Sequence, residues 1–361
     1  MATESALRHL GVGLGRLRLW HDGLGEFSRQ LGLALAERAT ELRSRDGIAL
    51  HFHLPRAWHG VFGNQVGYLD THTSQRWLHP RATRFSLWHH LHQHLRLRAP
   101  LGTRAEVETV HDLNFLHTKT PAKQQRYRAI LSSRLQRRAA VVAITRHVAE
   151  DLARELPGLR RPVEVIHNGA TDLSLAARTA VAEAGDGPFL LHISRMAPSK
   201  NIEALLQLAA AWPQMPLVLA GATSAYTDTV RRLVAERGLA NVRIRLDLDE
   251  AQKAWLYAHC TAFLFPSLTE GFGLPAIEAM YFGKPVFLSR LTSLPEVGGD
   301  AACYFDAFDG ATMRSVVEHG LLRHALPGRA DVVREHAHQF SWSRCADAYV
   351  DLYRRQMGAA A

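Results

Sequence analysis

The most informative stretch of the sequence reads FPSLTEGFGLPAIEAM and runs from Phe265 to Met280. A short apolar segment enters a glycine-containing turn, and an apolar helical pattern follows it. The free amides of such a turn and of a helix N-terminus bind anions, phosphate above all. Glu270 lies before the predicted helix and Glu278 about one turn inside it. The stretch therefore predicts a strand, a phosphate-binding turn and a helix, with two carboxylates placed to contact different parts of one ligand.

The alternation of strand and helix continues on both sides of this stretch. Strands are expected at 16–20, 108–110, 140–144 and 163–166, and again at 189–193, 217–220, 242–246, 262–265 and 286–289. Helices are expected at 202–212, 250–258 and 275–282, and Thr145 is placed to cap a further helix. Residues 172–188 lack periodicity and predict a linker. Two such blocks indicate two doubly wound α/β domains with parallel sheets.

The composition limits the class of protein. The 361 residues are 47% hydrophobic and 21% charged, as in ordinary globular domains, and the length fits about two of them. The net charge of +9 favours acidic partners, but no aromatic and basic platform for nucleic acid is found. The three cysteines are far apart, which fits a reducing compartment. With no apolar signal segment in Met1–Leu10 and no run of about 18 apolar residues, a cytoplasmic protein is expected.

The two glutamates of the opening stretch are separated by seven residues, and the stretch resembles the E-x7-E signature of glycosyltransferase family four. Residues 283–286 (GKPV) and 293–302 resemble that family too. The resemblance covers most of the chain. It implies a retaining, metal-independent glycosyltransferase with the GT-B fold, in which two Rossmann-like domains face a central cleft. The implied domains are 1–171 for the acceptor, 172–339 for the nucleotide-sugar, and a helix in 340–361 that packs back on the first.

A second cluster, from Ser194 to Asn201, resembles the arginine and lysine pair with which that family holds the donor diphosphate. A departing nucleoside diphosphate gains negative charge, which the fixed cations of Arg195 and Lys200 can stabilise without a metal. Arginine offers a planar fork and lysine a point charge. Without the opening stretch, the same two residues would be taken as exposed surface cations.

The first half of the chain holds two weaker clusters. His111 and Asp112 follow a strand and resemble the family's His-Asp segment, where a histidine can hydrogen-bond a sugar hydroxyl or shuttle a proton. A core histidine beside a helix-capping aspartate is the alternative. The glycine turn with Gly23 and Gly25 resembles a loop near the donor phosphate, and an ordinary turn is its alternative.

The resemblance and these clusters together give the expected site residues. Donor-binding residues are expected at Gly23, Gly25, Asn168, Arg195, Lys200, Leu246, Glu270, Gly271, Phe272, Gly273, Leu274 and Glu278. Residues expected to act in the reaction are His111, Asp112, Arg195, Lys200 and Glu270, and acceptor contacts are expected from His89, His92 and His111. No metal and no cofactor besides the nucleotide-sugar substrate are expected.

Three open questions concern the histidine run, an Asp-x-Asp sequence and a basic segment. His89 and His92 could share a helical face and line the acceptor cleft, hold a metal, or be structural. Asp247 and Asp249 have the spelling of a metal motif, although a helix cap explains Asp249 better. The segment Arg126–Arg138 has Ile130, Leu131 and Leu135 on one side and arginines on the other. It is interpreted as a solvated helix face or a surface for anionic membranes.

The donor and acceptor are less determined. The His-Asp segment resembles that of bacterial mannosyltransferases, which favours GDP-mannose, and UDP-sugars stay open. The acceptor is expected to be a glycan or lipid-linked saccharide of cell-surface polysaccharide or lipopolysaccharide. A phosphorylase or sucrose-type synthase of the same fold, and a binding protein that has lost catalysis, are the alternatives.

Overall fold

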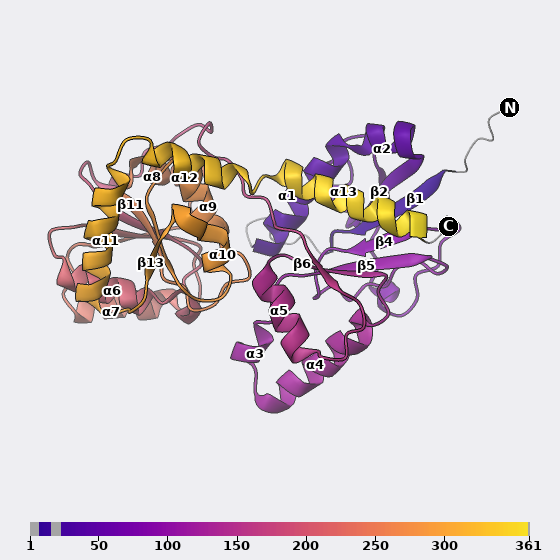
Figure 1. The fold of residues 1–361 in the computed structure, drawn as a ribbon, viewed down its shortest axis with the longest axis horizontal. Coiled ribbons are helices and arrows are strands. Elements are labelled where there is room, and N and C mark those ends of the chain that lie inside the picture. Colours follow the sequence, from indigo (N-terminus) through magenta and orange to yellow (C-terminus); the bar gives the residue numbers. More distant parts are fainter. Residues whose placement is uncertain (1–6, 16–22, 360–361) are drawn as a thin grey trace. The chain divides into compact units, whose positions relative to one another are not determined.

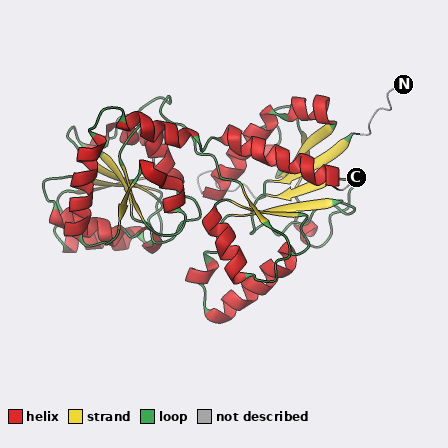
Figure 2. Ribbon diagram, viewed as in Figure 1, coloured by secondary structure: helices red, strands yellow, loops and turns green. Residues whose placement is uncertain are grey.

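The structure is a computed structural model that describes residues 7–15 and 23–359, and it divides the chain into two compact units. The first unit comprises Met1–Gly169 and Trp342–Ala361, and the second is Ala170–Ser341 (Figure 1). The expected boundaries, 171/172 and 339/340, each differ from these by two residues. In each unit, helices surround a central group of strands (Figure 2).

The first unit alternates strands with helices and closes with the last helix of the chain. Its elements are β1 (Arg8–Gly13), α1 (Gly23–Glu37), α2 (Ala39–Asp46), β2 (Ile48–Leu54), η1 (Arg56–Trp58), β3 (Gly67–Asp70), η2 (Thr73–Arg76), β4 (Leu87–His90), β5 (Ala105–Val110), α3 (Phe115–Thr118), α4 (Pro121–Leu135), β6 (Ala140–Ala143), α5 (Arg146–Glu155), β7 (Val163–Val165) and α13 (Trp342–Ala359). The strand expected at 16–20 lies outside the described residues. Strands β1 to β4 were not predicted. In β1 the glycines hid the apolar pattern, and one of them is required by packing, because a Cβ on Gly11 would lie 2.1 Å from the Trp88 ring.

The second unit contains every strand and helix that was predicted for it, and also a strand at 303–305 and helices at 227–236, 294–298, 310–324 and 329–338 that were not predicted. It contains η3 (Ala182–Ala184), β8 (Leu190–Ile193), η4 (Pro198–Lys200), α6 (Ile202–Ala211), β9 (Leu217–Gly221), α7 (Thr227–Glu236), β10 (Val242–Leu246), α8 (Glu250–His259), β11 (Ala262–Phe265), α9 (Leu274–Tyr281), β12 (Val286–Ser289), α10 (Leu294–Gly298), η5 (Gly299–Ala301), β13 (Cys303–Phe305), α11 (Gly310–His324) and α12 (Arg329–His338). The residues that precede β8 form mainly loop, in agreement with the predicted linker.

Both sheets are parallel and doubly wound. Among the described residues the first unit has a seven-stranded sheet in the order β3-β2-β1-β4-β5-β6-β7. The second unit, described throughout, has six strands in the order β10-β9-β8-β11-β12-β13. Each order reverses beside its first strand, and ligands of open parallel sheets bind beyond the carboxyl ends at this reversal. The predicted class of two Rossmann-like domains is thus confirmed, and the switch points are β1/β4 and β8/β11.

Each unit has its own apolar core. In the first, Val12, Phe27 and Phe52 are fully buried, and Tyr349 and Tyr353 of α13 belong to the same cluster. In the second, a separate cluster is built from the strands and helices of that unit. The end of the chain therefore completes the core of the domain in which the chain begins.

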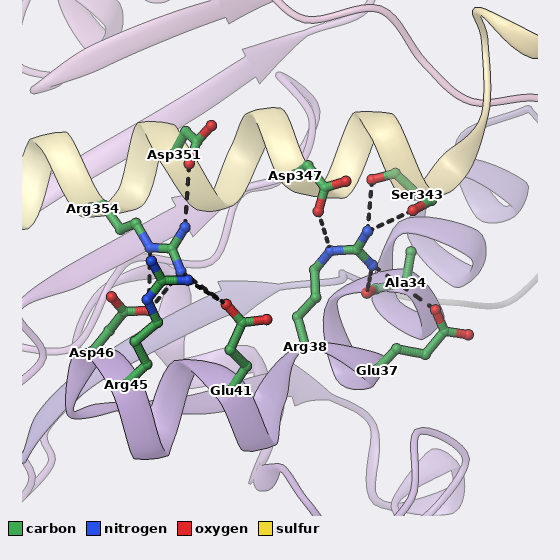
Figure 3. A network of polar contacts seen from close by, with 10 residues as sticks. All are labelled: Ala34, Glu37, Arg38, Glu41, Arg45, Asp46, Ser343, Asp347, Asp351 and Arg354. Carbon is green, nitrogen blue, oxygen red and sulfur yellow. Dashed lines mark hydrogen bonds and ion pairs between the residues drawn. The ribbon is translucent and has the colours of Figure 1, made fainter.

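Charged side chains form a set of hydrogen bonds and ion pairs along α13 (Figure 3). The Arg38 guanidinium donates to Asp347 at 2.6 Å, to the Ala34 carbonyl at 2.7 Å and to the Ser343 hydroxyl at 2.7 Å. Arg354 donates to the Asp46 carboxylate at 2.8 Å. Exposed ion pairs contribute little stability. These polar contacts therefore set the register of α13, and its buried tyrosines supply most of the packing energy.

Candidate functional site

The turn between β11 and α9 is held by the loop after β12. The Ser293 hydroxyl donates to the carbonyls of Glu270 at 3.0 Å and Phe272 at 3.2 Å, and the Glu270 amide donates to the Thr292 hydroxyl at 3.0 Å. Gly273 has φ 110°, a left-handed conformation that side chains disfavour, just before α9 begins. The predicted strand, turn and helix are confirmed, and Leu274 is the first residue of the helix.

Lys200 and Glu270 meet at the switch point of the second sheet. Lys200 follows β8 and Glu270 follows β11, and their side chains form a hydrogen-bonded ion pair with exposed fractions of 18% and 12%. The Leu268 amide also donates to the Ser199 carbonyl at 2.8 Å, so a backbone hydrogen bond connects the two loops. The structure thus joins two clusters that are 70 residues apart in sequence.

Arg195 lies on the same loop as Lys200 but is exposed. Within the described part of the chain its guanidinium makes no hydrogen bond or ion pair. The backbone beneath it is closely packed, because a Cβ on Gly221 would lie 1.9 Å from the Ser194 carbonyl oxygen. An accessible arginine on a fixed backbone suits the binding of an anion.

Glu278 is oriented by a residue that sequence reasoning missed. The Tyr257 hydroxyl donates to the Glu278 carboxylate at 2.8 Å. Tyr257 is fully buried on α8, and burial raises the pKa of its phenol well above the usual value, so the hydroxyl stays a donor. In the sequence, Tyr257 is simply an apolar-face residue of a predicted helix, and nothing there identifies its partner.

The Asp-x-Asp sequence is used structurally. The Asp249 carboxylate accepts from the Gln252 amide at 2.7 Å and caps α8, as predicted. Asp247 accepts from the amide and the hydroxyl of Thr223, at 3.1 and 2.8 Å, and these hydrogen bonds lower the pKa of its carboxyl group. Leu246, an expected donor contact, is the last residue of β10 and is half-buried. Among the described residues no group of histidines, cysteines and carboxylates is arranged for a metal.

His111 and Asp112 directly follow strand β5 of the first unit. The His111 ring is buried, and its Nε2 lies 2.9 Å from the Leu91 carbonyl, to which it donates. Burial lowers the pKa of His111 to about 4, so the ring is neutral near pH 7. Asp112 is half-buried, and one carboxylate oxygen accepts from the Asn114 amide at 2.9 Å.

His89 is structural, which corrects the predicted acceptor contact. It lies on strand β4, not on a helix, and is fully buried. Its Nδ1 lies 2.6 Å from the Tyr353 hydroxyl and its Nε2 lies 2.8 Å from the Thr109 hydroxyl, so both ring nitrogens are occupied. His92 follows the strand, is half-buried, and accepts from the His94 amide at 3.2 Å. The two histidines therefore do not share one face.

The remaining expected donor residues of the first unit are Gly23, Gly25 and Asn168. Gly23 and Gly25 form the first turn of α1, and the residues just before them lie outside the described part. Asn168 is 4% exposed, and its side-chain oxygen has no hydrogen-bond partner among the described residues. Such an atom is costly to bury and suits a site that a ligand completes.

Two arginines of the basic segment, Arg134 and Arg138, are less exposed than predicted. Arg134 forms an ion pair with Glu108 at 2.7 Å, and Arg138 donates to Glu108 at 2.8 Å and to Glu106 at 2.5 Å. Glu108 is 1% exposed. Ile130, expected beside Leu131 on an apolar side, is 51% exposed. The prediction that Arg134 and Arg138 belong to a membrane-facing surface is wrong, because both are held by strand carboxylates.

Comparisons with known proteins find related glycosyltransferases, and the match to a family model lies in the second unit. Residues 176–308 match the model of the family described as glycosyl transferases group 1. O-antigen chain mannosyltransferase B of Escherichia coli is 36% identical over 177 residues, covering 46% of this chain and 45% of that protein. D-inositol 3-phosphate glycosyltransferase of Mycobacterium leprae is 31% identical over 236 residues, covering 58% and 54%. The chain thus spans about half the length of these curated relatives.

Solved structures extend the likeness to the whole chain. Sucrose-phosphate synthase from Thermosynechococcus elongatus superposes with a TM-score of 0.73 at 20% identity, covering 98% of this chain and 100% of that one. HepE of Anabaena, solved with UDP and glucose, gives 0.66 at 15% identity, covering 96% and 99%. At such identities the likeness concerns the fold. No described helix combines the length and apolar character that crossing a membrane requires.

Proposed function

Because the chain has the GT-B fold and resembles glycosyltransferase family four, we propose that it is a retaining hexosyltransferase that uses a nucleotide-sugar donor. The observation that carries the proposal is the meeting of Lys200 and Glu270 at the β8/β11 switch point. A donor diphosphate would form an ion pair with Lys200 in place of Glu270, and Arg195 and the amides of the 271–274 turn would also bind it. Glu270, released from Lys200, would contact the sugar, and Glu278 the ribose hydroxyls.

Mannose from GDP-mannose is the proposed donor substrate. The mannosyltransferases among the relatives support the sugar, and the O-antigen role of the first supports a glycan or lipid-linked saccharide of lipopolysaccharide as acceptor. A UDP-sugar is the second candidate, favoured by the UDP and glucose bound to HepE. In the first domain, the neutral His111 and the carboxylate of Asp112 would bind acceptor hydroxyls. The proposed reaction needs no metal.

Nucleotide-induced stabilisation tests the donor site. At about 100 times its Kd, GDP should stabilise the folded protein by roughly 2.7 kcal/mol, and UDP, ADP and dTDP should do less. Glu278→Ala should weaken GDP binding by about 1.5–3 kcal/mol, since it removes a charged hydrogen bond to ribose, and Tyr257→Phe should weaken it less. Glu236→Ala, an exposed change on α7, is the matched control. Unaltered GDP affinity in Glu278→Ala would disprove the ribose contact.

Nucleotide binding, combined with an assay of sugar transfer, separates the alternatives. A protein that binds GDP but transfers no sugar from GDP-mannose to a mannose-containing acceptor would be the non-catalytic form of the fold. Stabilisation by UDP alone would favour the UDP-sugar donor. If inorganic phosphate were needed to release a sugar phosphate, the protein would be a phosphorylase.

A membrane surface is proposed on a different part of the first unit from the predicted one. Residues 71–105 contain no aspartate or glutamate. Trp77, Leu78 and Leu101 are 71%, 54% and 57% exposed, and the Leu101 amide donates to the His79 carbonyl, which places Leu101 beside the segment that carries the other two. The exposed arginines of the segment are Arg81, Arg84, Arg96, Arg98 and Arg104. Exposed aromatic and aliphatic side chains among arginines favour an anionic membrane surface.

Cosedimentation with vesicles containing phosphatidylglycerol checks this surface. Arg81→Glu with Arg84→Glu should lower the binding constant for the vesicles by about thirtyfold or more, because each basic residue near an anionic surface contributes about 1 kcal/mol. Arg126→Glu with Arg137→Glu, a matched pair of exposed residues around α4, should have a smaller effect. The reverse order of effects, or equal binding to neutral vesicles, would contradict the assignment.

A further inference from the structure

The side chain of Gln93 forms two hydrogen bonds with the backbone of the His111–Asp112 segment. Its carbonyl oxygen Oε1 accepts from the His111 amide at 3.0 Å, and its Nε2 donates to the Asp112 carbonyl at 3.0 Å. Gln93 is 8% exposed, on the loop that follows β4. Because one rigid amide group supplies both the acceptor and the donor, it fixes the position of the peptide and its orientation.

The same loop fixes the His111 ring. The Leu91 carbonyl accepts from His111 Nε2 at 2.9 Å, which requires the tautomer protonated on that nitrogen. The edge-to-face contact with Phe27, at 4.5 Å between ring centroids, holds the imidazole plane. Nδ1 of His111 is therefore left as a hydrogen-bond acceptor, which suits a donating hydroxyl.

A buried ion pair holds the loop from the other side. Arg134 Nη2 donates to the main-chain carbonyl of Gln93 at 2.5 Å and forms an ion pair with the Glu108 carboxylate at 2.7 Å. Arg138 completes the Glu108 pair at 2.8 Å. Breaking a buried ion pair by removing one partner is strongly destabilising. The loop that carries Gln93 is thereby attached to β5, the strand that precedes His111.

We infer that Gln93 is a positioning residue, which holds His111 and Asp112 in the geometry that receives the acceptor hydroxyl. The role of His111 and Asp112 in this inference rests on the proposed function, but the two hydrogen bonds from Gln93 are independent of it. An apolar residue of similar size would fill the same space yet leave the His111 amide and the Asp112 carbonyl without partners. The amide of Gln93 is therefore needed for its hydrogen bonds and not only for its volume.

Two substitutions of Gln93 separate these contributions. Gln93→Leu keeps the approximate volume and removes both hydrogen bonds. Gln93→Glu keeps an acceptor for the His111 amide and removes the donor to Asp112. Gln124→Leu is the matched control, because the Gln124 amide nitrogen donates to the Leu116 and Lys119 carbonyls in the same domain, at 2.7 and 2.8 Å.

Amide hydrogen exchange of the full chain measures the hydrogen bond from the His111 amide to Gln93 without any enzymatic assay. In Gln93→Leu the His111 amide should exchange about five- to tenfold faster, the equivalent of one lost hydrogen bond. In Gln93→Glu it should keep most of its protection, and in Gln124→Leu it should be unchanged. Unchanged protection in Gln93→Leu would overturn the inference, whether or not the protein transfers sugar.

The kinetic arm tests positioning for the reaction. In Gln93→Leu the kcat for sugar transfer should fall about tenfold while the Kd for donor nucleotide stays within about twofold, since two neutral hydrogen bonds are lost and the donor is held elsewhere. Gln93→Glu should recover part of the loss. An unaltered kcat, or a kcat loss that Gln124→Leu reproduces, would overturn the positioning role. Absence of transfer by the unmodified chain would instead contradict the proposed function.

Discussion

Lys200→Ala is expected to lower kcat/KM for sugar transfer by about 10- to 150-fold, the kinetic equivalent of roughly 1.5–3 kcal/mol. The ammonium group lies against Glu270 at the carboxyl end of the sheet, where a departing diphosphate would gain negative charge. Removing it takes away that stabilisation and leaves a carboxylate that is 12% exposed without its ion-pair partner. Steady-state kinetics with the donor identified by nucleotide stabilisation measure the effect.

Three comparisons make the result specific. Arg195→Ala should do similar damage, and the double substitution should be less than additive because both cations would bind one ligand. Arg231→Ala, an exposed change on α7, should leave the rate unaltered. Activity should persist in chelator. If chelator abolished activity, manganese restored it and Lys200→Ala stayed active, a metal would carry the charge and the cationic site would be wrong.

Acidification from pH 7.5 to pH 5 is expected to remove several kcal/mol from the free energy of unfolding of the first unit. Burial is the main cause that lowers the pKa of His53 to about 3, of His111 to about 4, and of His89 well below 6.5. These rings are neutral in the folded state at pH 5, whereas in the unfolded chain they titrate near 6.5. The unfolded state therefore binds more protons, and each histidine costs roughly 2 kcal/mol at pH 5.

The loss begins as the pH falls through 6.5 and grows until the pKa values of the folded state are reached. Three such histidines amount to about 6 kcal/mol, comparable with the net stability of a whole domain. In the second unit His192 is the corresponding fully buried case, with its pKa lowered to about 4 mainly by burial. The first unit should therefore lose more stability than the second, as measured by denaturant titration with domain-resolved hydrogen exchange.

His53 offers the matched test. Its Nε2 lies 2.9 Å from the Gln75 side-chain oxygen, and a glutamine at this position would not titrate. His53→Gln should lower stability at pH 7.5 but reduce the slope of unfolding free energy against pH by up to one proton, about 1.4 kcal/mol per pH unit. An unaltered slope in His53→Gln would show that this histidine is not kept neutral by the fold.

Local patterns in the sequence were sufficient for the second domain. The left-handed glycine before α9, the helix cap of Asp249 and the apolar patterns of the strands and helices are local features of the chain. They follow from glycine placement, capping side chains and apolar periodicity, which are all visible in one sequence. The fold class and the cluster of charged donor-site candidates were therefore predictable, and so was the cap of Thr145 on α5.

The partners of polar side chains were decided only by the tertiary structure. Arg138 and Glu108 are 30 residues apart, and His89 and Tyr353 are 264 apart. A run of arginines is read from sequence as a solvated face, and only the neighbouring strand β5 reveals that two of them neutralise a buried carboxylate. Tyr257 and Gln93 were missed for the same reason. Nothing in the local sequence encodes which strand or helix will lie beside another, and that neighbour sets whether a side chain binds a ligand or the protein itself.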